Sequence, residues 1–457
     1  MSGSPIGYGT RMAARARAVV AVACFVQFVD VVGVTLLIVA LAAIQRDLGL
    51  GAPALSWAAA VYALVFGSLL VLGGRAADLA GRRVMFVGGN LAVVAGSALC
   101  AVAGGAGALI AGRALQGAGA AAAVPAALAA ILAAVPDGPG RGRALGWWTL
   151  AGAAGGASGF VLGGVVTQAV GWRWLFAGVA AVALAAALLG LTFPAGRRRG
   201  GSLDVTGALL LTGSVVVLLL GLQQGPWPVL LLVPIGLWGF AVTERRVREP
   251  LVPPELWSVR SFGTGAAVAS VLTATTGGAA VVGTLFLQED LGVTAGGSGA
   301  VFLVFSIAVA AVSTVAPAVL RRAGPSAAMA LGLAVVALAL AGEAFAVAAG
   351  SLPLFVAGLG LSGLGLGVAS VASTAYGTSE AGEERAGLVG GILNAAAQTG
   401  TAVGVAVLLL AAERGRALDL ALAALVALAA AASTIRRRGR GADRFSRPGS
   451  VRPPSGG

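Results

Sequence analysis

Histidine and lysine are absent from this sequence, and all 30 of its basic residues are arginine. A chain without histidine cannot build a histidine metal site, a serine–histidine–aspartate triad or a histidine proton relay. The sequence holds two cysteines, Cys24 and Cys100, and both lie inside apolar runs, which is typical of small core side chains. We therefore expect neither a metal site nor a cofactor.

Charged residues are scarce. They form 10% of the 457 residues, whereas soluble domains carry about 25%. Hydrophobic residues form 58%, and the 72 glycines would let membrane helices pack closely. The net charge of +13 comes from arginines between apolar runs and at the chain ends, so it does not indicate nucleic-acid binding. The composition predicts a polytopic membrane protein in a lipid bilayer.

Fourteen apolar runs follow one another, and about 20 apolar residues suffice to cross a bilayer. They lie at residues 18–44, 55–73, 84–106, 109–133, 143–168, 172–193, 203–222, 227–243, 262–287, 299–320, 327–349, 352–376, 387–412 and 417–435. The predicted fold class is therefore an all-α membrane protein with fourteen transmembrane helices.

The placement of arginine predicts the orientation, because basic loops remain in the cytoplasm. With both termini inside, 25 arginines lie on the cytoplasmic side, four lie outside and Arg113 lies within a run. The preference for Arg, Ala and Gly is typical of a GC-rich bacterial genome, so we expect a bacterial inner membrane. Removing the pair 203–222 and 227–243 would preserve the asymmetry. A twelve-span core with an inserted hairpin is thus an alternative description.

The link between the second and third runs carries Gly74, Asp78, Gly81, Arg82 and Arg83. The two glycines permit tight turns, and Asp78 can cap a helix start or interact with its positive end. Considered alone, the segment is also compatible with an ordinary basic loop.

The fourth run contains Arg113, Gln116, Gly117 and Gly119 in the order Arg-Ala-Leu-Gln-Gly-Ala-Gly. An arginine inside a span costs about 3 kcal/mol unless it faces a cavity or a partner. We expect Arg113 to lie near a cavity and to assist proton movement. A purely structural hydrogen-bonding role is the alternative.

Glycines recur every four residues in the fifth run, at Gly155, Gly159 and Gly163, and Gly164 follows directly. The first three share one helix face and form a groove for close helix packing. The neighbouring Phe160 interrupts the pattern with a large side chain.

Together these motifs resemble those of the major facilitator superfamily. The loop resembles its cytoplasmic signature, the fourth run its Arg-x-x-Gln-Gly-x-Gly-Ala motif, and the fifth run its antiporter motif, in which Phe160 replaces a proline. With Trp172-Arg173-Trp174 and Leu203-Asp204-Val205-Thr206-Gly207, the chain is similar to the fourteen-span drug:proton antiporters of the EmrB/QacA type.

The resemblance implies two six-helix bundles that rock about a central cavity, with a proton gradient as the energy source. It implies a gate lock in the loop of residues 74–83 and a hinge at the fifth-run glycines. The implied domains are a cytoplasmic tail (1–17), an N-terminal bundle (18–196), an inserted hairpin with a cytoplasmic linker (197–261), a C-terminal bundle (262–435) and a disordered basic tail (436–457).

Two carboxyl groups lie within runs, Asp30 in the first and Glu343 in the eleventh. In a low dielectric a carboxyl group can bind and release protons near neutral pH. The family's aspartate would fall at Gly33, so we interpret Asp30, about 4.5 Å away along the helix, as a displaced proton carrier. A local hydrogen bond or a pair with Arg113 is the alternative. Glu343 is a second proton-coupling candidate unless it is hydrated near the outer surface.

Gln27, Asn394 and Gln398 are candidates for lining the cavity, and each could equally hold helices together. No catalytic residues are predicted, because the sequence lacks a Gly-x-Ser-x-Gly elbow and a Walker loop. We predict a monomeric, proton-coupled exporter of small amphipathic compounds that serves multidrug or antibiotic efflux and binds no nucleic acid. A dedicated exporter of one metabolite or antibiotic, an importer, an uncoupled facilitator and, remotely, a membrane sensor or enzyme are the alternatives.

Overall fold

The computed structural model describes residues 5–136, 138–193, 203–223, 227–380, 385–411 and 415–445, and its regular structure is helical throughout these ranges. The helices are α1 (Pro5–Leu48), α2 (Ala52–Ala80), α3 (Arg82–Ala101), α4 (Ala106–Ala134), α5 (Pro139–Ala169), α6 (Arg173–Gly190), α7 (Val205–Gln223), α8 (Leu232–Glu244), α9 (Arg260–Leu285), α10 (Ala295–Ala323), α11 (Pro325–Ala348), α12 (Leu352–Thr378), α13 (Ala386–Ala411) and α14 (Arg416–Phe445). Three short turns complete them: η1 (Trp227–Leu231), η2 (Pro254–Ser258) and the π-turn η3 (Phe286–Asp290). Helices of this kind satisfy their own backbone hydrogen bonds, as lipid requires.

The expected count of fourteen spans is not confirmed. Within the described ranges, 12 helices are long and apolar enough to cross a membrane. The two helices of the hairpin are shorter, with apolar segments at Val205–Gly221 and Pro228–Glu244. The second of these begins as the 3-10 turn η1, which contains Pro228, and α8 itself has 13 residues. The alternative of a twelve-span core with an inserted hairpin describes this structure better.

Both ends of the chain are more helical than expected. The helix α1 begins at Pro5, within the predicted polar tail, and α14 continues to Phe445, although residues 436 onward were expected to be disordered. Alanine and arginine favour helix, which accounts for the extension of α1 over residues 11–17, whereas Pro5, Gly7 and Gly9 at its start do not favour helix. Residues 446–457 of the predicted tail lie outside the described ranges.

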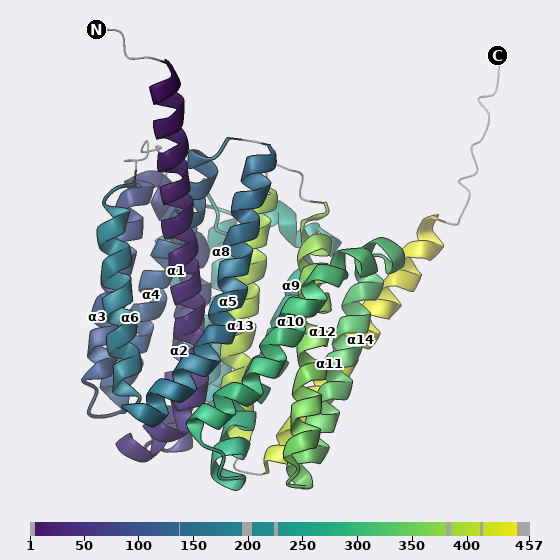
Figure 1. Ribbon diagram of the computed structural model, residues 1–457. Helices are drawn as coiled ribbons and strands as arrows, with labels where there is room; N and C mark the ends of the chain where they lie inside the picture. The colour runs from purple at the N-terminus through teal and green to yellow at the C-terminus, as the bar shows by residue number, and fades with distance from the viewer. Residues whose placement is uncertain are drawn as a thin grey trace, which may run out of the picture.

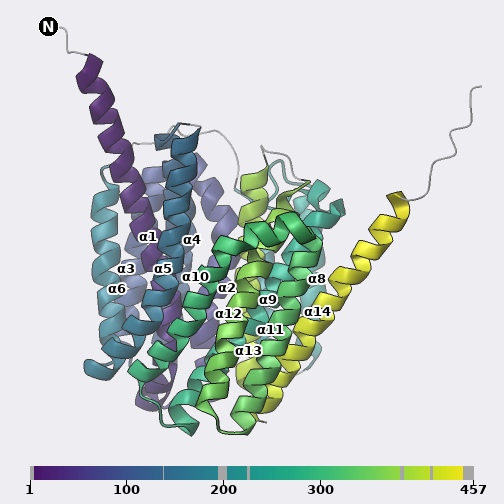
Figure 2. The ribbon, with the colours of Figure 1, turned by 45° about the vertical axis from the view of Figure 1, so that its right-hand side comes forward.

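The long helices form two bundles, α1–α6 and α9–α14 (Figure 1). In the first, α1 packs on α5 and α4 packs between α2 and α3; in the second, α9 packs on α13 and α11 packs between α12 and α14. The bundles touch through α2 with α13 and through α5 with α10, as the turned view also shows (Figure 2). The start of α1 and the end of α14 lie at the same end of the molecule (Figure 1).

Residues 245–259, which we call the strap, cross from the hairpin to the second bundle. The prolines and mixed charges of residues 244–261 suit an exposed linker or a surface helix, but Leu251 and Leu256 are both buried. Leu251 packs among residues of α2, α7 and α8, and Leu256 packs among residues of α9 and α13. The Arg75 guanidinium of α2 donates to the carbonyl oxygen of Glu249. The strap therefore contacts the hairpin and both bundles.

Candidate functional site

Arg113 lies at the centre of the first bundle and is 2% exposed. Its Nη1 atom donates to the carbonyl oxygen of Gly33 on α1 at 3.2 Å and to Oε1 of Gln116 at 2.9 Å. Its Cζ atom lies 4.6 Å from the ring centroid of Tyr62 on α2, within the range of a cation–π contact. The guanidinium thus joins α1, α2 and α4, because a charge inside a membrane protein needs such partners.

A chain of polar contacts extends from this arginine in two directions. On one side the cation–π contact leads to Tyr62, whose hydroxyl donates to Oδ1 of Asp30 on α1. On the other side Nε2 of Gln116 donates to the Ser97 hydroxyl of α3 at 2.7 Å. The chain therefore links a carboxyl group, a phenol, a guanidinium and an amide across four helices.

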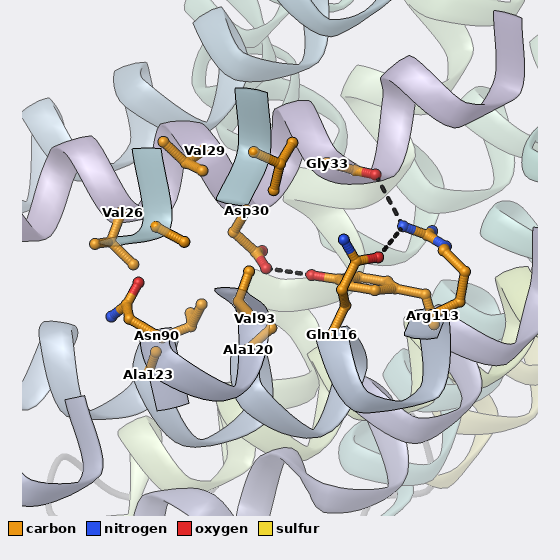
Figure 3. Close-up of a pocket in the computed structure, with 14 residues that line it drawn as sticks. Val26, Val29, Asp30, Gly33, Asn90, Val93, Arg113, Gln116, Ala120 and Ala123 are labelled. Atoms are coloured by element: carbon orange, nitrogen blue, oxygen red, sulfur yellow. Dashed lines mark hydrogen bonds between the residues drawn. The ribbon is translucent and has the colours of Figure 1, made fainter. Parts of the chain in front are cut away.

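A cavity of about 30 Å³ adjoins these groups, and Figure 3 shows how they converge on it. Asp30, Asn90 and Arg113 enter it from three different helices, while most of the remaining lining is apolar. A polar cavity of this size can hold a water molecule. The arrangement can thus bind a proton at Asp30, between the Tyr62 hydroxyl and the cavity.

The structure brings Asp30 and Arg113 together as the sequence suggested, but through Tyr62. Arg113 donates hydrogen bonds to Gly33 and Gln116, whereas the Tyr62 hydroxyl donates to Asp30. Tyr62 was not among the predicted site residues. The available signal was that the chain has just three tyrosines and that this one stands in the middle of an apolar run.

We expect Tyr62→Phe to lower the free energy of unfolding by about 1–3 kcal/mol, the cost of leaving a buried acceptor unsatisfied. The phenylalanine ring would still support Arg113, so the loss would report the hydroxyl alone. Unfolding in mixed detergent micelles, followed by tryptophan fluorescence, measures the effect. Tyr376→Phe is the matched control, because no described residue bonds to the Tyr376 hydroxyl. Equal stability of the two variants would contradict the prediction.

Glu343 occupies a second buried position, in the other bundle. It is 1% exposed, so the alternative of a hydrated residue near the outer surface is wrong. Its Oε1 atom accepts a hydrogen bond of 2.7 Å from the Ser362 hydroxyl of α12. It lines a small cavity of about 10 Å³ that is separate from the cavity beside Asp30.

The expected loop of residues 74–83 is mostly helical. Gly74 lies within α2, its backbone follows the helix to Ala80, and a single residue, Gly81, separates α2 from α3. Gly81 has φ 99°, so it needs the conformational freedom of glycine, as predicted, whereas Gly74 makes no turn. Asp78 does not cap α3, because the cap position is Gly81 and no side chain bonds there. For Asp78, Arg82 and Arg83, the described residues include no ion-pair partner.

The motif glycines lie where helices approach closely. A Cβ atom at Gly155 or Gly163 would come within 2.5 or 2.7 Å of carbonyl oxygens of α1, and one at Gly159 would collide with Thr35. Gly164 faces Ala295 of α10 instead, and in α4 Gly117 and Gly119 face α2 and α3. The predicted close packing of the glycine face against a neighbouring helix is therefore present, while a hinge role stays a prediction.

The predicted cavity-lining amides do not line either buried cavity. Gln27 lies against Gly152 of α5, and Gln398 lies against Gly67 of α2. Asn394 is exposed.

Phe160, which replaces a proline of the antiporter motif, stacks on Phe302 of α10 with ring centroids 4.9 Å apart and so joins the two bundles.

Within the described ranges no group of three cysteine, aspartate or glutamate residues is placed to hold a metal ion.

Comparison with known proteins identifies relatives. A family model described as Major Facilitator Superfamily matches residues 23–405. The puromycin resistance protein pur8 of Streptomyces alboniger is 33% identical over 84% of this chain and 79% of its own length. The cephamycin export protein CmcT of Amycolatopsis lactamdurans is 32% identical over 68% of both chains. The tetracenomycin C resistance and export protein of Streptomyces glaucescens is 30% identical over 82% of this chain and 72% of its own.

Solved structures show the same arrangement of helices. The human organic anion transporter MFSD10 (TETRAN) superposes with a TM-score of 0.64 at 17% identity, covering 92% of this chain and 99% of that one. An auto-inhibited POT family peptide transporter superposes with a TM-score of 0.68 at 17% identity, covering 96% and 98%. At such identities the likeness shows the fold alone. Since the family model spans most of the sequence and the curated relatives are resistance and export proteins, this chain belongs to the Major Facilitator Superfamily and is a multi-pass membrane transporter.

Proposed function

We propose that this protein exports small amphipathic compounds, antibiotics among them, in exchange for protons. The observation that carries the proposal is the chain from Asp30 through Tyr62 to the buried Arg113. A carboxyl group that is hydrogen-bonded beside a buried cation can change its protonation when water reaches its cavity. In a transporter, such a change at the first and fourth helices would couple proton movement to rocking of the bundles.

The relatives support export as the direction of transport. Proteins named for resistance to puromycin and for export of cephamycin and tetracenomycin C align with most of this chain. Each of those names refers to one antibiotic, so a dedicated exporter of a single antibiotic or metabolite is the second candidate. The two candidates share the coupling site and differ in the range of substrates.

We further propose that the transporter acts as a monomer in the plasma membrane of a bacterium, with both termini in the cytoplasm. The distribution of arginine supports this orientation. The end of the molecule that carries the start of α1 and the end of α14 would then face the cytoplasm (Figure 1). The contacts of Phe160 and Gly164 with α10 would lie on the outer side.

Asp30→Asn is expected to abolish proton counterflow, because asparagine keeps the shape and the hydrogen bond but cannot titrate. The assay uses purified protein in liposomes that hold a pH-sensitive dye, with an imposed proton gradient and a panel of lipophilic cations and antibiotics. Glu380→Gln is the matched control, since that carboxyl group is exposed beyond α12. Coupled flux that survives Asp30→Asn would overturn the proposed role of Asp30. Substrate flux without proton movement in the unmodified protein would instead indicate an uncoupled facilitator.

A further inference from the structure

The helices of the two bundles correspond after similar shifts along the sequence. The helix α12 begins 246 residues after α4, and α11 begins 243 residues after α3. The close contacts of glycines agree with both shifts, because Gly112 of α4 meets Gly96 and Cys100 of α3, and Gly358 of α12 meets Ala339 and Glu343 of α11. Positions on α4 and α12 that differ by 246, and positions on α3 and α11 that differ by 243, are therefore equivalent.

These shifts relate the polar groups of the two halves. They take Gln116 to Ser362 and Cys100 to Glu343. In each half the fourth-helix side chain, Gln116 or Ser362, forms a hydrogen bond of 2.7 Å with a third-helix side chain, Ser97 or Glu343. Glu343 thus lies about one helical turn beyond the place of Ser97, at which the network of Arg113 ends in the first bundle.

The cavities correspond as well. Arg113 lines the first cavity, and its equivalent on α12, Leu359, lines the second. The second half therefore has leucine in place of the buried arginine of the fourth helix, and its acid, Glu343, lies on the third helix.

Glu343 differs from Asp30 in having no cation beside it. The other side chains that line its cavity come from α9, α10 and α12, namely Thr276, Ala279, Ala280, Phe302, Phe305, Leu359 and Ser362, and none of them is charged. On α14, which also packs on α11, the acid near the same end is Asp419, which does not line this cavity. No described residue forms an ion pair with Glu343. An ionised carboxylate in such a place is costly, so the carboxyl group must carry a proton while the cavity stays closed.

We propose that Glu343 is a second proton-binding site, built in the C-terminal bundle against Ser362, the equivalent of Gln116 in the Arg113 network. The inference rests on the proposed function, because it assumes that protons move through the transport cycle. Opening of the second bundle to water would release this proton in the same transport cycle in which Asp30 exchanges its own. Each transport cycle would then carry one proton in each bundle.

The test measures the number of protons moved per substrate molecule in liposomes, with Glu343→Gln compared with the unmodified protein. Glutamine keeps the volume and can still accept the Ser362 hydrogen bond, so the bundle is expected to fold. The proton-to-substrate ratio is expected to fall by about half, because one of two intramembrane sites no longer titrates. A ratio unchanged from that of the unmodified protein would overturn the proposal.

A spectroscopic readout separates protonation from a purely structural role. Infrared spectra of the membrane-embedded protein are expected to show a protonated carboxyl band that Glu343→Gln removes and Asp30→Asn retains. A spectrum without this difference would show that Glu343 carries no proton. If the unmodified protein moves substrate but no protons, the proposed function fails as a whole. If Asp30→Asn stops counterflow while Glu343→Gln changes neither ratio nor spectrum, only the present inference fails.

Discussion

Replacing Arg113 with leucine is expected to lower the rate of proton-driven transport by about two to three orders of magnitude, since each 1.4 kcal/mol amounts to a factor of ten. Removing one partner from a buried charged network costs about 3–5 kcal/mol. The substitution would leave the Gly33 carbonyl and the Gln116 side chain without their donor and Tyr62 without its cation. Leucine is a well-matched choice, because Leu359 occupies the equivalent place in the second bundle.

Two further variants show whether charge is the cause. Arg113→Lys keeps the positive charge but loses the planar contact with the Tyr62 ring, so part of the coupled flux is expected to remain. Arg46→Ala is the control, because Arg46 is exposed and bonds within its own helix. Coupled flux in Arg113→Leu that equals that of Arg46→Ala would contradict the prediction.

The double substitution of Gly155 and Gly163 by alanine is expected to separate α1 from α5 and to destabilise the first bundle. The new methyl groups would come within 2.5 and 2.7 Å of the carbonyl oxygens of Phe28 and Leu36, and backbone atoms cannot move aside as a flexible side chain can. Overpacking of this kind costs about 1–3 kcal/mol at each site. Thermal unfolding in detergent would detect the loss.

Gly156→Ala provides a control on the same helix. Its nearest neighbour would be a methyl carbon of Val31 at 3.7 Å, which is an ordinary contact. Alanine also favours helix over glycine by about 0.5–1 kcal/mol, so this variant is expected to be as stable as the unmodified protein or more stable. Similar losses in Gly156→Ala and in the double variant would show that the face toward α1 has no special role.

The helices could be predicted from the sequence because long apolar runs have few structural options in a bilayer. The hairpin was overestimated for the same reason: its runs are apolar, but η1 interrupts the second one before α8. The loop of residues 74–83 was misjudged because glycine usually marks turns. Here Gly74 is followed by Ala76 and Ala77, which favour helix, and α2 continues.

The site was predictable where a residue was unusual in its run and unpredictable where it was ordinary. Arg113, Asp30 and Glu343 stood out as charges among apolar residues; Arg113 and Glu343 prove to be buried and Asp30 half-buried. Tyr62 gave only a weak signal, the rarity of tyrosine in this chain, because an aromatic ring is normal in an apolar run. Helices that are apolar on every face also give no periodic signal of rotation, so the partners of Gln27 and Gln398 could not be derived.

The strap limits the ways in which the two halves can rotate. Leu251 and Leu256 are held by opposite bundles only five residues apart, and Arg75 fixes the chain at Glu249 between the hairpin and α2. This connection limits how far Leu251 and Leu256 can move apart, because five residues span at most about 18 Å when fully extended. Points close to a rotation axis move least. Relative rotation of the halves therefore costs least about an axis that passes near the strap, where α2 meets α13, and displacement is then greatest on the opposite side, along α5 and α10.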